Sequence, residues 1–528
     1  MSETSGTTAP DTAASGRVPA YSWYALCILF LIYVLNFVDR QILSILANDI
    51  KADLGLSDAD LGFLYGTAFA IFYALFGIPL GRLADGWSRT RLLAVGMALW
   101  SCMTALSGFA RTGATLAAAR IGVGVGEATA SPCAYSLISD WFPQRLRATA
   151  LGVYSAGLFV GSGLSLLIGG LVVENWSRAW PSGGAPLGLV GWQAAFLAVG
   201  VPGLILALWV LSLREPVRGA MEGTPSPGQA HPWRSFAREV LQIVPPFTLI
   251  SAARRGARPL MLNLAAAVVL AAAAWILGTM TANPGQFWFV ATGAYAVLSW
   301  SMGLKSADAP TYAMTWRTPA FVCIVLAYAV VAYVGYTVSY WASPYAERTF
   351  GFDKVQLGLL IGAPAALGGF LGVLGGGWLA DRLQRRHASG RLLVVLIGLI
   401  VPVPIVLTGY MTTSATLFLV CSFLVQMATS SALGAAAAAS QSLVLPRMRG
   451  TATAIFFLGA TLIGLAFGPY AAGFVSELTG SLGTGVITNL ALVPFGVIAL
   501  LVAIRRYPDA FSSRFDRSSA AGERITSA

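Results

Sequence analysis

The fold of this chain is indicated by a short polar stretch between two apolar segments, Gly-Arg-Leu-Ala-Asp at residues 81–85, with Arg89 and Arg91 behind it. The same pattern returns 296 residues later as Gly-Trp-Leu-Ala-Asp at 377–381, followed by Arg385 and Arg386. A second stretch, Arg-Leu-Arg-Ala-Thr-Ala at 145–150, returns 302 residues later as Arg-Met-Arg-Gly-Thr-Ala at 447–452. Two independent repeats with nearly equal offsets predict a duplicated half.

The segments around these repeats are too apolar for a water-soluble protein. Of the 528 residues, 56% are hydrophobic and 10% are charged, whereas about 25% are charged in soluble domains. Lipid is therefore the solvent for most of the chain, which excludes a soluble enzyme, a nucleic-acid-binding protein and a disordered scaffold. The net charge of +11 does not indicate nucleic acid, because the basic residues fall in short runs between apolar segments, as the positive-inside rule predicts.

Fourteen segments have the roughly 20 mostly apolar residues that a membrane-spanning helix needs. They lie at 22–48, 60–83, 91–109, 114–139, 148–173, 192–213, 260–280, 286–304, 319–342, 355–380, 391–411, 415–440, 450–475 and 484–504. The first connecting loop is acidic and the next is basic, and later basic runs keep this alternation. The positive-inside rule then places both termini in the cytoplasm.

This alternation holds only if the segment 260–304 crosses the membrane an even number of times. We therefore expect an all-α polytopic membrane protein with two six-helix halves and an inserted transmembrane hairpin. The predicted parts are a disordered cytoplasmic N-terminus at 1–20, a first bundle at 21–213, a cytoplasmic linker at 214–258, the hairpin at 259–305, a second bundle at 318–505 and a cytoplasmic tail at 506–528.

The repeated Gly-x-Leu-Ala-Asp-x-x-x-Arg loop resembles the signature cytoplasmic loop of the major facilitator superfamily. The resemblance covers about 22–213 and 319–505 and implies the major facilitator fold with alternating access, from which the inserted hairpin departs. It also implies that the two loops are latches that hold the cytoplasmic side closed when the protein faces outward. The residues in these latches are Gly81, Asp85, Arg89, Arg91, Asp381, Arg385 and Arg386. Gly86 stands where many members carry Arg, which weakens the first latch.

A narrower resemblance lies in the N-terminal half. Asn-Phe-Val-Asp-Arg-Gln at 36–41, Ala-Arg-Ile-Gly-Val-Gly-Val-Gly-Glu-Ala at 119–128 and Ser-Asp-Trp-Phe-Pro at 139–143 are similar to the spinster branch. Members of that branch move lysolipids and sphingosine phosphates, which implies a small amphipathic substrate from the lipid bilayer. The Asp-Arg element alone also looks like organic-anion symporters, so a multidrug or organic-anion transporter is the alternative.

Four charged residues interrupt apolar spans: Asp39 and Arg40 in the first, Arg120 and Glu127 in the fourth. Each costs roughly 2.5–3.5 kcal/mol near the bilayer centre, so we expect them to face one another or a wet cavity. Arg120 and Glu127 are seven residues apart, which puts them on one helix face. We predict that these four residues couple transport to protons, because a movable arginine can switch a buried carboxylate between binding and releasing a proton. A static ion-pair cluster is the structural alternative.

Arg40 and Arg120 are also predicted to hold an anionic head group, because the donor fork of arginine suits phosphate. Tyr333, Tyr336 and Tyr340 form an aromatic stripe at helical spacing. Such a stripe is typical of helix packing, and the alternative is a cavity wall for an acyl chain. The other predicted substrate-binding residues are Tyr33, Asn36 and Gln441.

Several chemistries are not expected from this sequence. Gly122, Gly124 and Gly126 follow no strand and predict close helix packing rather than a nucleotide loop. A phosphate-binding Gly-Lys-Ser/Thr motif does not occur, so we expect a proton gradient, without ATP or a cofactor, to drive transport. The five cysteines have no paired spacing and the two histidines lie in polar loops, which predicts neither a metal site nor a catalytic cluster.

The sequence therefore predicts a secondary transporter that works as a monomer. Its expected location is the plasma membrane, which is the inner membrane if the source is a bacterium. A membrane receptor or membrane enzyme is the alternative of a different class, but a receptor has no need of two latches and an enzyme needs a nucleophile, metal or histidine in a cavity.

Overall fold

The computed structural model describes residues 18–181, 184–219, 221 and 231–523, and within these ranges it contains helices and no strand. Thirteen of the helical segments are long and apolar enough to span a membrane. The predicted fourth span is a further one, because its helix is broken into α5 (Gly113–Glu127) and α6 (Ala130–Trp141), each too short to be counted alone. The chain is thus a multi-pass all-α membrane protein, as the sequence predicts.

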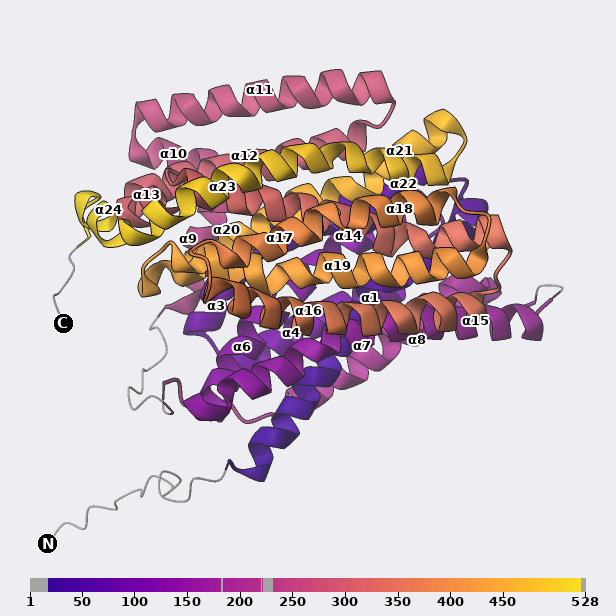
Figure 1. Ribbon diagram of the computed structural model, residues 1–528. Coiled ribbons are helices and arrows are strands. Elements are labelled where there is room, and N and C mark those ends of the chain that lie inside the picture. The colour runs from indigo at the N-terminus through magenta and orange to yellow at the C-terminus, as the bar shows by residue number, and fades with distance from the viewer. Residues whose placement is uncertain (1–17, 182–183, 220, 222–230, 524–528) are drawn as a thin grey trace, which may run out of the picture.

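Each half consists of six spans. The first half comprises α1 (Ala20–Leu54), α2 (Asp58–Gly62) with α3 (Ala68–Gly86), α4 (Arg89–Ser107), α5 with α6, α7 (Gln144–Ala179) and α8 (Gly191–Val210). The second half comprises α14 (Pro319–Phe350), α15 (Lys354–Leu357) with α16 (Ala363–Gln384), α17 (Gly390–Ile400) with α18 (Pro402–Met411), α19 (Ala415–Ser442), α20 (Arg449–Gly459) with α21 (Ala466–Thr479), and α22 (Leu482–Thr488) with α23 (Val493–Ser512). Figure 1 shows the first half below and the second half above.

The duplication is visible in local structure as well as in sequence. Ser57 caps α2 and Asp353 caps α15, each through a capping box. Each of these helices then passes through one π-helical turn, at Phe63–Thr67 in the first half and Gly358–Gly362 in the second. The two caps and the two turns stand at nearly the same offset as the repeated loops. The two halves are therefore built on the same plan.

The inserted segment forms a membrane hairpin with helical flanks. These elements are α9 (Pro232–Ile243), α10 (Thr248–Arg255), α11 (Ala257–Thr281), α12 (Pro284–Ala307) and α13 (Ala309–Thr315). α11 lies at the outside of the bundle (Figure 1), and only 11% of the residues in its most apolar 18-residue stretch are buried. The region expected to be a polar linker thus contains α9 and α10, and α9 packs along α3, where Trp87 contacts Trp233 with ring centroids 5.1 Å apart.

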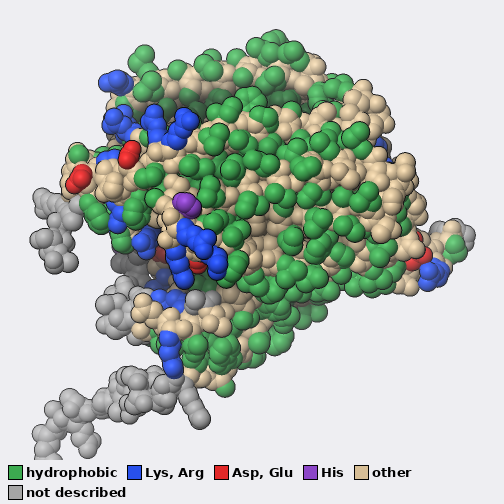
Figure 2. Space-filling model, in the orientation of Figure 1, with side chains coloured by type: hydrophobic (Ala, Val, Ile, Leu, Met, Phe, Trp, Pro, Cys, Tyr) green, Lys and Arg blue, Asp and Glu red, His purple; other side chains and the backbone are tan. Residues whose placement is uncertain are grey.

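Both ends of the described chain lie on one side of the bundle (Figure 1). We call this side the arginine-rich end, because Lys and Arg side chains gather there (Figure 2). It carries the loops after α3, α6, α16 and α19, and the loops after α1, α14, α18 and α21 lie at the opposite end. The predicted tail at 506–528 is partly helical, because α23 continues to Ser512 and α24 (Arg514–Ala520) follows. Most of the N-terminus predicted to be disordered lies outside the described residues.

Small residues allow the spans to pack closely. A Cβ on Gly161 of α7 would lie 2.3 Å from the backbone oxygen of Val34 in α1, and a Cβ on Gly372 of α16 would lie 2.2 Å from that of Met427 in α19. Any side chain at these two positions would push the helices apart. Gly161 and Gly372 therefore serve close packing of the helices.

The two halves are joined at the opposite end. Among the described residues, the hydrogen bonds and ion pairs that link the two halves involve residues 41–67 of the first half and residues 339–354, 466 and 476 of the second. α1 and α6 slope away from α16 and α20 toward the arginine-rich end (Figure 1). The described conformation is therefore closed at the opposite end.

Candidate functional site

The four charged residues predicted within the spans lie together in the first half; we call Asp39, Arg40, Arg120 and Glu127 the charged cluster. Nη2 of Arg40 in α1 donates to Oε2 of Glu127 in α5 at 2.6 Å, and the two side chains are 8% and 0% exposed. The other carboxylate oxygen of Glu127 is buried without a donor among the described residues. Desolvating both charges is expensive, so this pair is weak evidence for stability and stronger evidence for a function.

Aromatic rings cover the guanidinium of Arg40. Its Cζ lies 4.5 Å from the ring centroid of Phe69 and 5.0 Å from that of Tyr73, both in α3. The Cζ of Arg120 lies 5.3 Å from the same Phe69 ring. Phe69 therefore contacts both arginines, and cation–π attraction compensates part of their lost hydration.

Asp39 and Arg120 are close to the pair but not engaged in it. The hydroxyl of Thr104 in α4 lies 2.5 Å from both carboxylate oxygens of Asp39 and shares its one proton between them. Nη1 of Arg120 donates only to the backbone oxygen of Asp39, at 3.5 Å. The Nε and Nη2 atoms of Arg120 are buried with no acceptor in the described part of the chain. Because buried polar groups nearly always have partners, the free donors of Arg120 indicate a place for an acceptor from outside.

The glycines of the fourth span bring the cluster together. A Cβ on Gly124 would lie 2.6 Å from the backbone oxygen of Phe69, and one on Gly126 would lie 2.8 Å from that of Gly96 in α4. α5 can thus lie directly against α3 and α4, and it ends at Glu127, where the span is broken. Broken helices at membrane depth occur where they line a cavity or are buried in protein.

The other predicted substrate-binding residues do not all join the cluster. Tyr336 lies close enough to Arg40 for the two side chains to interact electrostatically. Asn36 is buried in α1, one helical turn before Arg40. Tyr33 stacks on Tyr154 with ring centroids 4.3 Å apart.

The remaining three predicted residues form hydrogen bonds elsewhere in the described structure. Tyr333 donates to Asn489 inside the second half at 3.0 Å, and Tyr340 donates to the backbone of Leu61 between the halves at 3.3 Å. Gln441 donates to Thr453 at 2.9 Å, at the arginine-rich end of α19. The three tyrosines of the stripe therefore lie in three different environments. Tyr333 and Tyr340 serve helix packing, and only Tyr336 lies near the charged cluster.

The opposite end holds an ion-pair group that the sequence did not reveal. Asp58, whose side chain is 4% exposed, accepts from Arg348 of the second half at 2.8 and 2.9 Å. It also accepts from Lys51 at 2.5 Å and from Ser476 at 2.7 Å. We call these four residues the opposite-end gate. Sequence reasoning counted Asp58 and Lys51 only as loop charges that set the orientation.

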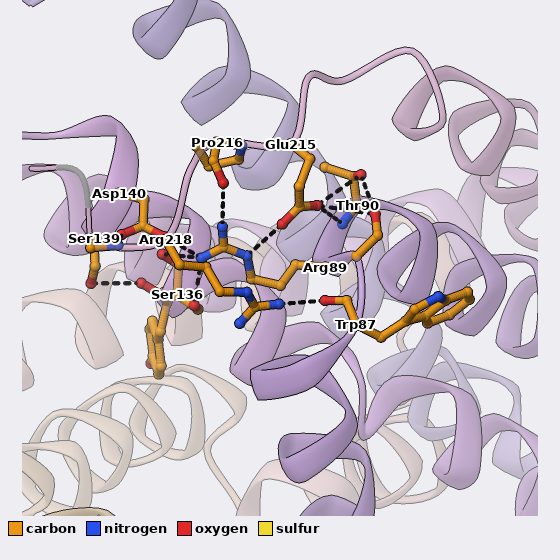
Figure 3. Close-up of polar contacts among 12 residues, drawn as sticks. Trp87, Arg89, Thr90, Ser136, Ser139, Asp140, Glu215, Pro216 and Arg218 are labelled. Carbon is orange, nitrogen blue, oxygen red and sulfur yellow. Dashed lines mark hydrogen bonds and ion pairs between the residues drawn. The ribbon is translucent and has the colours of Figure 1, made fainter. Parts of the chain in front are cut away.

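A second polar group holds the arginine-rich end of the first half (Figure 3). The buried Arg89 at the start of α4 pairs with Asp140 of α6 and with Glu215 at 2.7 Å. It also donates to the backbone oxygen of Pro216 at 2.9 Å, while Arg218 donates to the backbone oxygen of Trp87. The segment after α8 is thereby fastened across α4 and α6. Asp140 lies in a stretch quoted for the family resemblance, but neither its role nor that of Glu215 was predicted.

The predicted latches are not engaged in this conformation. Arg89 pairs within its own half, and Asp85 is exposed, without an ion pair in the described part of the chain. Asp381 lies 3.8 Å from Arg391 in an exposed contact. Arg91, Arg385 and Arg386 are exposed, and Gly81 lies beside Pro132. Closure by these residues in another conformation stays a prediction.

The carboxylate of Glu215 makes a testable contribution to stability. Burial alone would raise the pKa of Glu215, but the hydrogen bonds from Thr90 and Arg89 outweigh it and hold the pKa below its ordinary value. A lowered pKa gives stability that is fully present above the unfolded value of about 4.3 and is lost as the pH falls through the folded value. Glu215→Gln is therefore expected to lower the melting temperature at neutral pH, by an amount that shrinks below about pH 4.

Melting curves of the two proteins across this pH range check the expectation. Glu174→Gln, which removes an exposed pair with Arg178, is the matched control and should change little. A difference for Glu215→Gln that stayed constant at all pH values would contradict the assignment.

Comparison with known proteins identifies the family. The profile of the Major Facilitator Superfamily matches residues 29–282 and 324–525. The chain belongs to the Major Facilitator Superfamily. An MFS-type efflux pump of Mycolicibacterium smegmatis is 28% identical over 490 residues, 92% of each chain. Protein spinster of Drosophila melanogaster is 29% identical over 202 residues, which are 38% of this chain and 31% of that protein.

A solved structure extends the likeness to the whole fold. A bacterial homolog of the human lysosomal transporter Spinster, in an inward-facing and unoccupied conformation, superimposes with a TM-score of 0.66 at 25% identity. The alignment covers 94% of this chain and 98% of that one. The predicted resemblance to the major facilitator superfamily and its spinster branch is thus confirmed. This superfamily consists of transporters and not of enzymes.

Proposed function

We propose that this major facilitator protein is a proton-coupled transporter that moves an amphipathic, anionic lysolipid or sphingolipid-like molecule by alternating access. The observation that carries the proposal is the buried Arg40–Glu127 pair at 2.6 Å beside the unpartnered donors of Arg120. The Arg40–Glu127 pair supplies a carboxylate that can exchange a proton, and the donors of Arg120 supply a site for an anion. No cofactor is needed for either.

Orientation follows from charge in this proposal. By the positive-inside rule the arginine-rich end is cytoplasmic, and both termini are therefore cytoplasmic too. The described conformation, closed at the opposite end, is then inward-facing. The protein works as a monomer in the plasma membrane, which is the inner membrane in a bacterium.

The coupling step uses the movable charge of Arg40. When Glu127 is ionised, Arg40 is held by it and unavailable to substrate. When Glu127 takes up a proton, Arg40 loses its charged partner and can turn to the anionic head group beside Arg120. Asp39 is the second carboxylate within reach and is kept in place by Thr104. Proton binding and substrate binding are thus linked through one guanidinium.

The substrate class follows from both ends of the site. Arginine forks suit phosphate and sulfate groups, while the half-buried rings of Phe37 and Tyr73 beside Arg40 and of Tyr33 offer apolar surface for a chain. The likeness to spinster proteins supports this choice.

A soluble organic anion is the second candidate. The probable L-galactonate transporter of Escherichia coli is 31% identical over 202 residues, 38% of this chain and 41% of that protein. The free donors of Arg120 fit a carboxylate as well as a phosphate. A sugar acid has no apolar chain, so the two candidates differ in whether a chain is required.

Arg120→Gln is expected to weaken binding of a lysophospholipid about 10–100-fold, because charge-assisted hydrogen bonds to the anion are lost. Uptake of labelled lysophospholipid and labelled galactonate into proteoliposomes measures both candidates, with Arg111→Gln, an exposed loop arginine, as the control. Uptake of galactonate alone would favour the second candidate. Unchanged lysophospholipid binding in Arg120→Gln would contradict the role of Arg120.

A further inference from the structure

A cavity of about 380 Å³ lies beside the inserted hairpin, away from the charged cluster. We infer that it holds one acyl chain of a bilayer phospholipid, whose head group lies at the arginine-rich end. This inference concerns the hairpin and does not rest on the proposed function.

The cavity joins three parts of the molecule. Its walls come from Ile71 in α3, from Val290 and Val297 in α12, and from Phe321 and Leu462 in the second half. A Cβ on Gly293 of α12 would lie 2.8 Å from Cδ1 of Ile71 and 3.3 Å from Cδ2 of Leu462. The glycine therefore lets α12 lie in the seam between the first half and the second.

The lining admits a hydrocarbon chain. Apart from the indole N–H of Trp316, the side chains around the cavity are apolar, and the cavity is partly open to the outside. Leu298, which lines the cavity, is 43% exposed and Val268 of α11 is 67% exposed, so both face the space that lipid fills. An empty cavity would lose the dispersion attraction that its walls gain from a filling molecule. In the hydrocarbon core of the bilayer, the molecules available to fill it are lipid acyl chains.

A polar group at the arginine-rich end of the cavity sets the direction of the lipid. Trp316 lines the cavity, and its indole N–H is buried with no acceptor among the described residues. The next residue, Arg317, is exposed, and both follow α13 at the arginine-rich end. A buried indole N–H normally finds an acceptor. An ester carbonyl of a phospholipid supplies one, and its phosphate can pair with Arg317.

The bound lipid has a consequence for access to the space between the halves. Two seams run between the halves along the membrane, one between α3 and the span formed by α20 and α21, and the other between α7 and α16. The hairpin and its lipid cover the first. A molecule that enters from the bilayer therefore has only the second seam available.

The test uses the full chain in liposomes with phosphatidylglycerol that carries a photoreactive diazirine in one acyl chain. After illumination, peptide mass spectrometry should find adducts concentrated on the cavity walls of α12 and α14. Val297→Trp fills the cavity and is expected to reduce these adducts about tenfold. Val268→Trp, on the exposed face of α11, is the matched control and should leave them unchanged.

Trp316→Phe removes only the hydrogen bond and should reduce the adducts about fivefold. If Val297→Trp does not give a folded protein by thermal unfolding, Ala294→Leu fills the same cavity and takes its place. Adducts spread evenly over α11 and α12, or unaffected by filling the cavity, would overturn the inference.

Discussion

Glu127→Gln is expected to transport substrate without coupling to protons. Glutamine has nearly the shape of glutamate and can still accept a hydrogen bond from Arg40, but it cannot bind or release a proton. Substrate accumulation driven by a pH gradient should therefore fall to the equilibrium level. Exchange of labelled for unlabelled substrate across the membrane should continue, because exchange needs no net proton movement.

The measurement is uptake into proteoliposomes with and without an imposed pH gradient, alongside exchange in the same preparation. Removing one partner of a buried ion pair destabilises a protein by about 3–5 kcal/mol, so both assays are run below the melting temperature of the variant. Glu174→Gln, at an exposed pair in α7, is the control and should behave as the wild type does. Full accumulation by Glu127→Gln would contradict the role assigned to this carboxylate.

Arg348→Ala is expected to open the opposite end of the protein. Arg348 makes two hydrogen bonds to Asp58 across the halves, at 2.8 and 2.9 Å, and the Asp58 side chain is 4% exposed. Hydrogen bonds to charged groups contribute about 1.5–3 kcal/mol each. Even the lower value for each of the two bonds should shift the balance between the conformations by at least about 100-fold toward the state that is open at this end.

Spin labels at Ala52 in α1 and Leu478 in α21 measure this opening, because both residues are exposed at the opposite end, one in each half. The distance distribution should move to longer values in Arg348→Ala. Arg178→Ala, which breaks an exposed pair within one half at the same end, is the matched control. An unchanged distribution in Arg348→Ala would show that the opposite-end gate does not hold the halves together.

The sequence predicted most of the fold because membrane folds obey strong one-dimensional rules. Apolar length gave the spans, and the alternation of loop charge required the even crossing that α11 and α12 provide. The break between α5 and α6 was not predicted, since Ala128 and Thr129 carry no signal of helix termination. The helices of the linker were missed because polar, proline-containing composition also suits a loop.

Of the charged cluster and its surroundings, only the charged residues could be predicted, because burying a charge in a span is costly. That cost predicted that Asp39, Arg40, Arg120 and Glu127 meet, and the structure places them together. Phe69 and Thr104 could not be found this way, because an aromatic ring and a hydroxyl within a span cost little. Nothing in a linear sequence gives the register between the halves.

The same lack of register hid two other features. Arg348 and Lys354 pair with Asp58 and Asp49 of the first half. From the sequence alone, these aspartates contribute only to the charge of the first loop. The tyrosines of α14 share one helical spacing, yet they contact different neighbours, because each depth along α14 has its own facing helix.

The central claim is that protons and an anionic lysolipid move together through a site built on Arg40 and Glu127. Its most direct test is to load proteoliposomes of the wild-type protein with a pH-sensitive dye and add lysophospholipid outside, with no gradient imposed. The account predicts a change in internal pH that follows the substrate and is absent in Glu127→Gln. Movement of labelled lysophospholipid without any change in internal pH would contradict it.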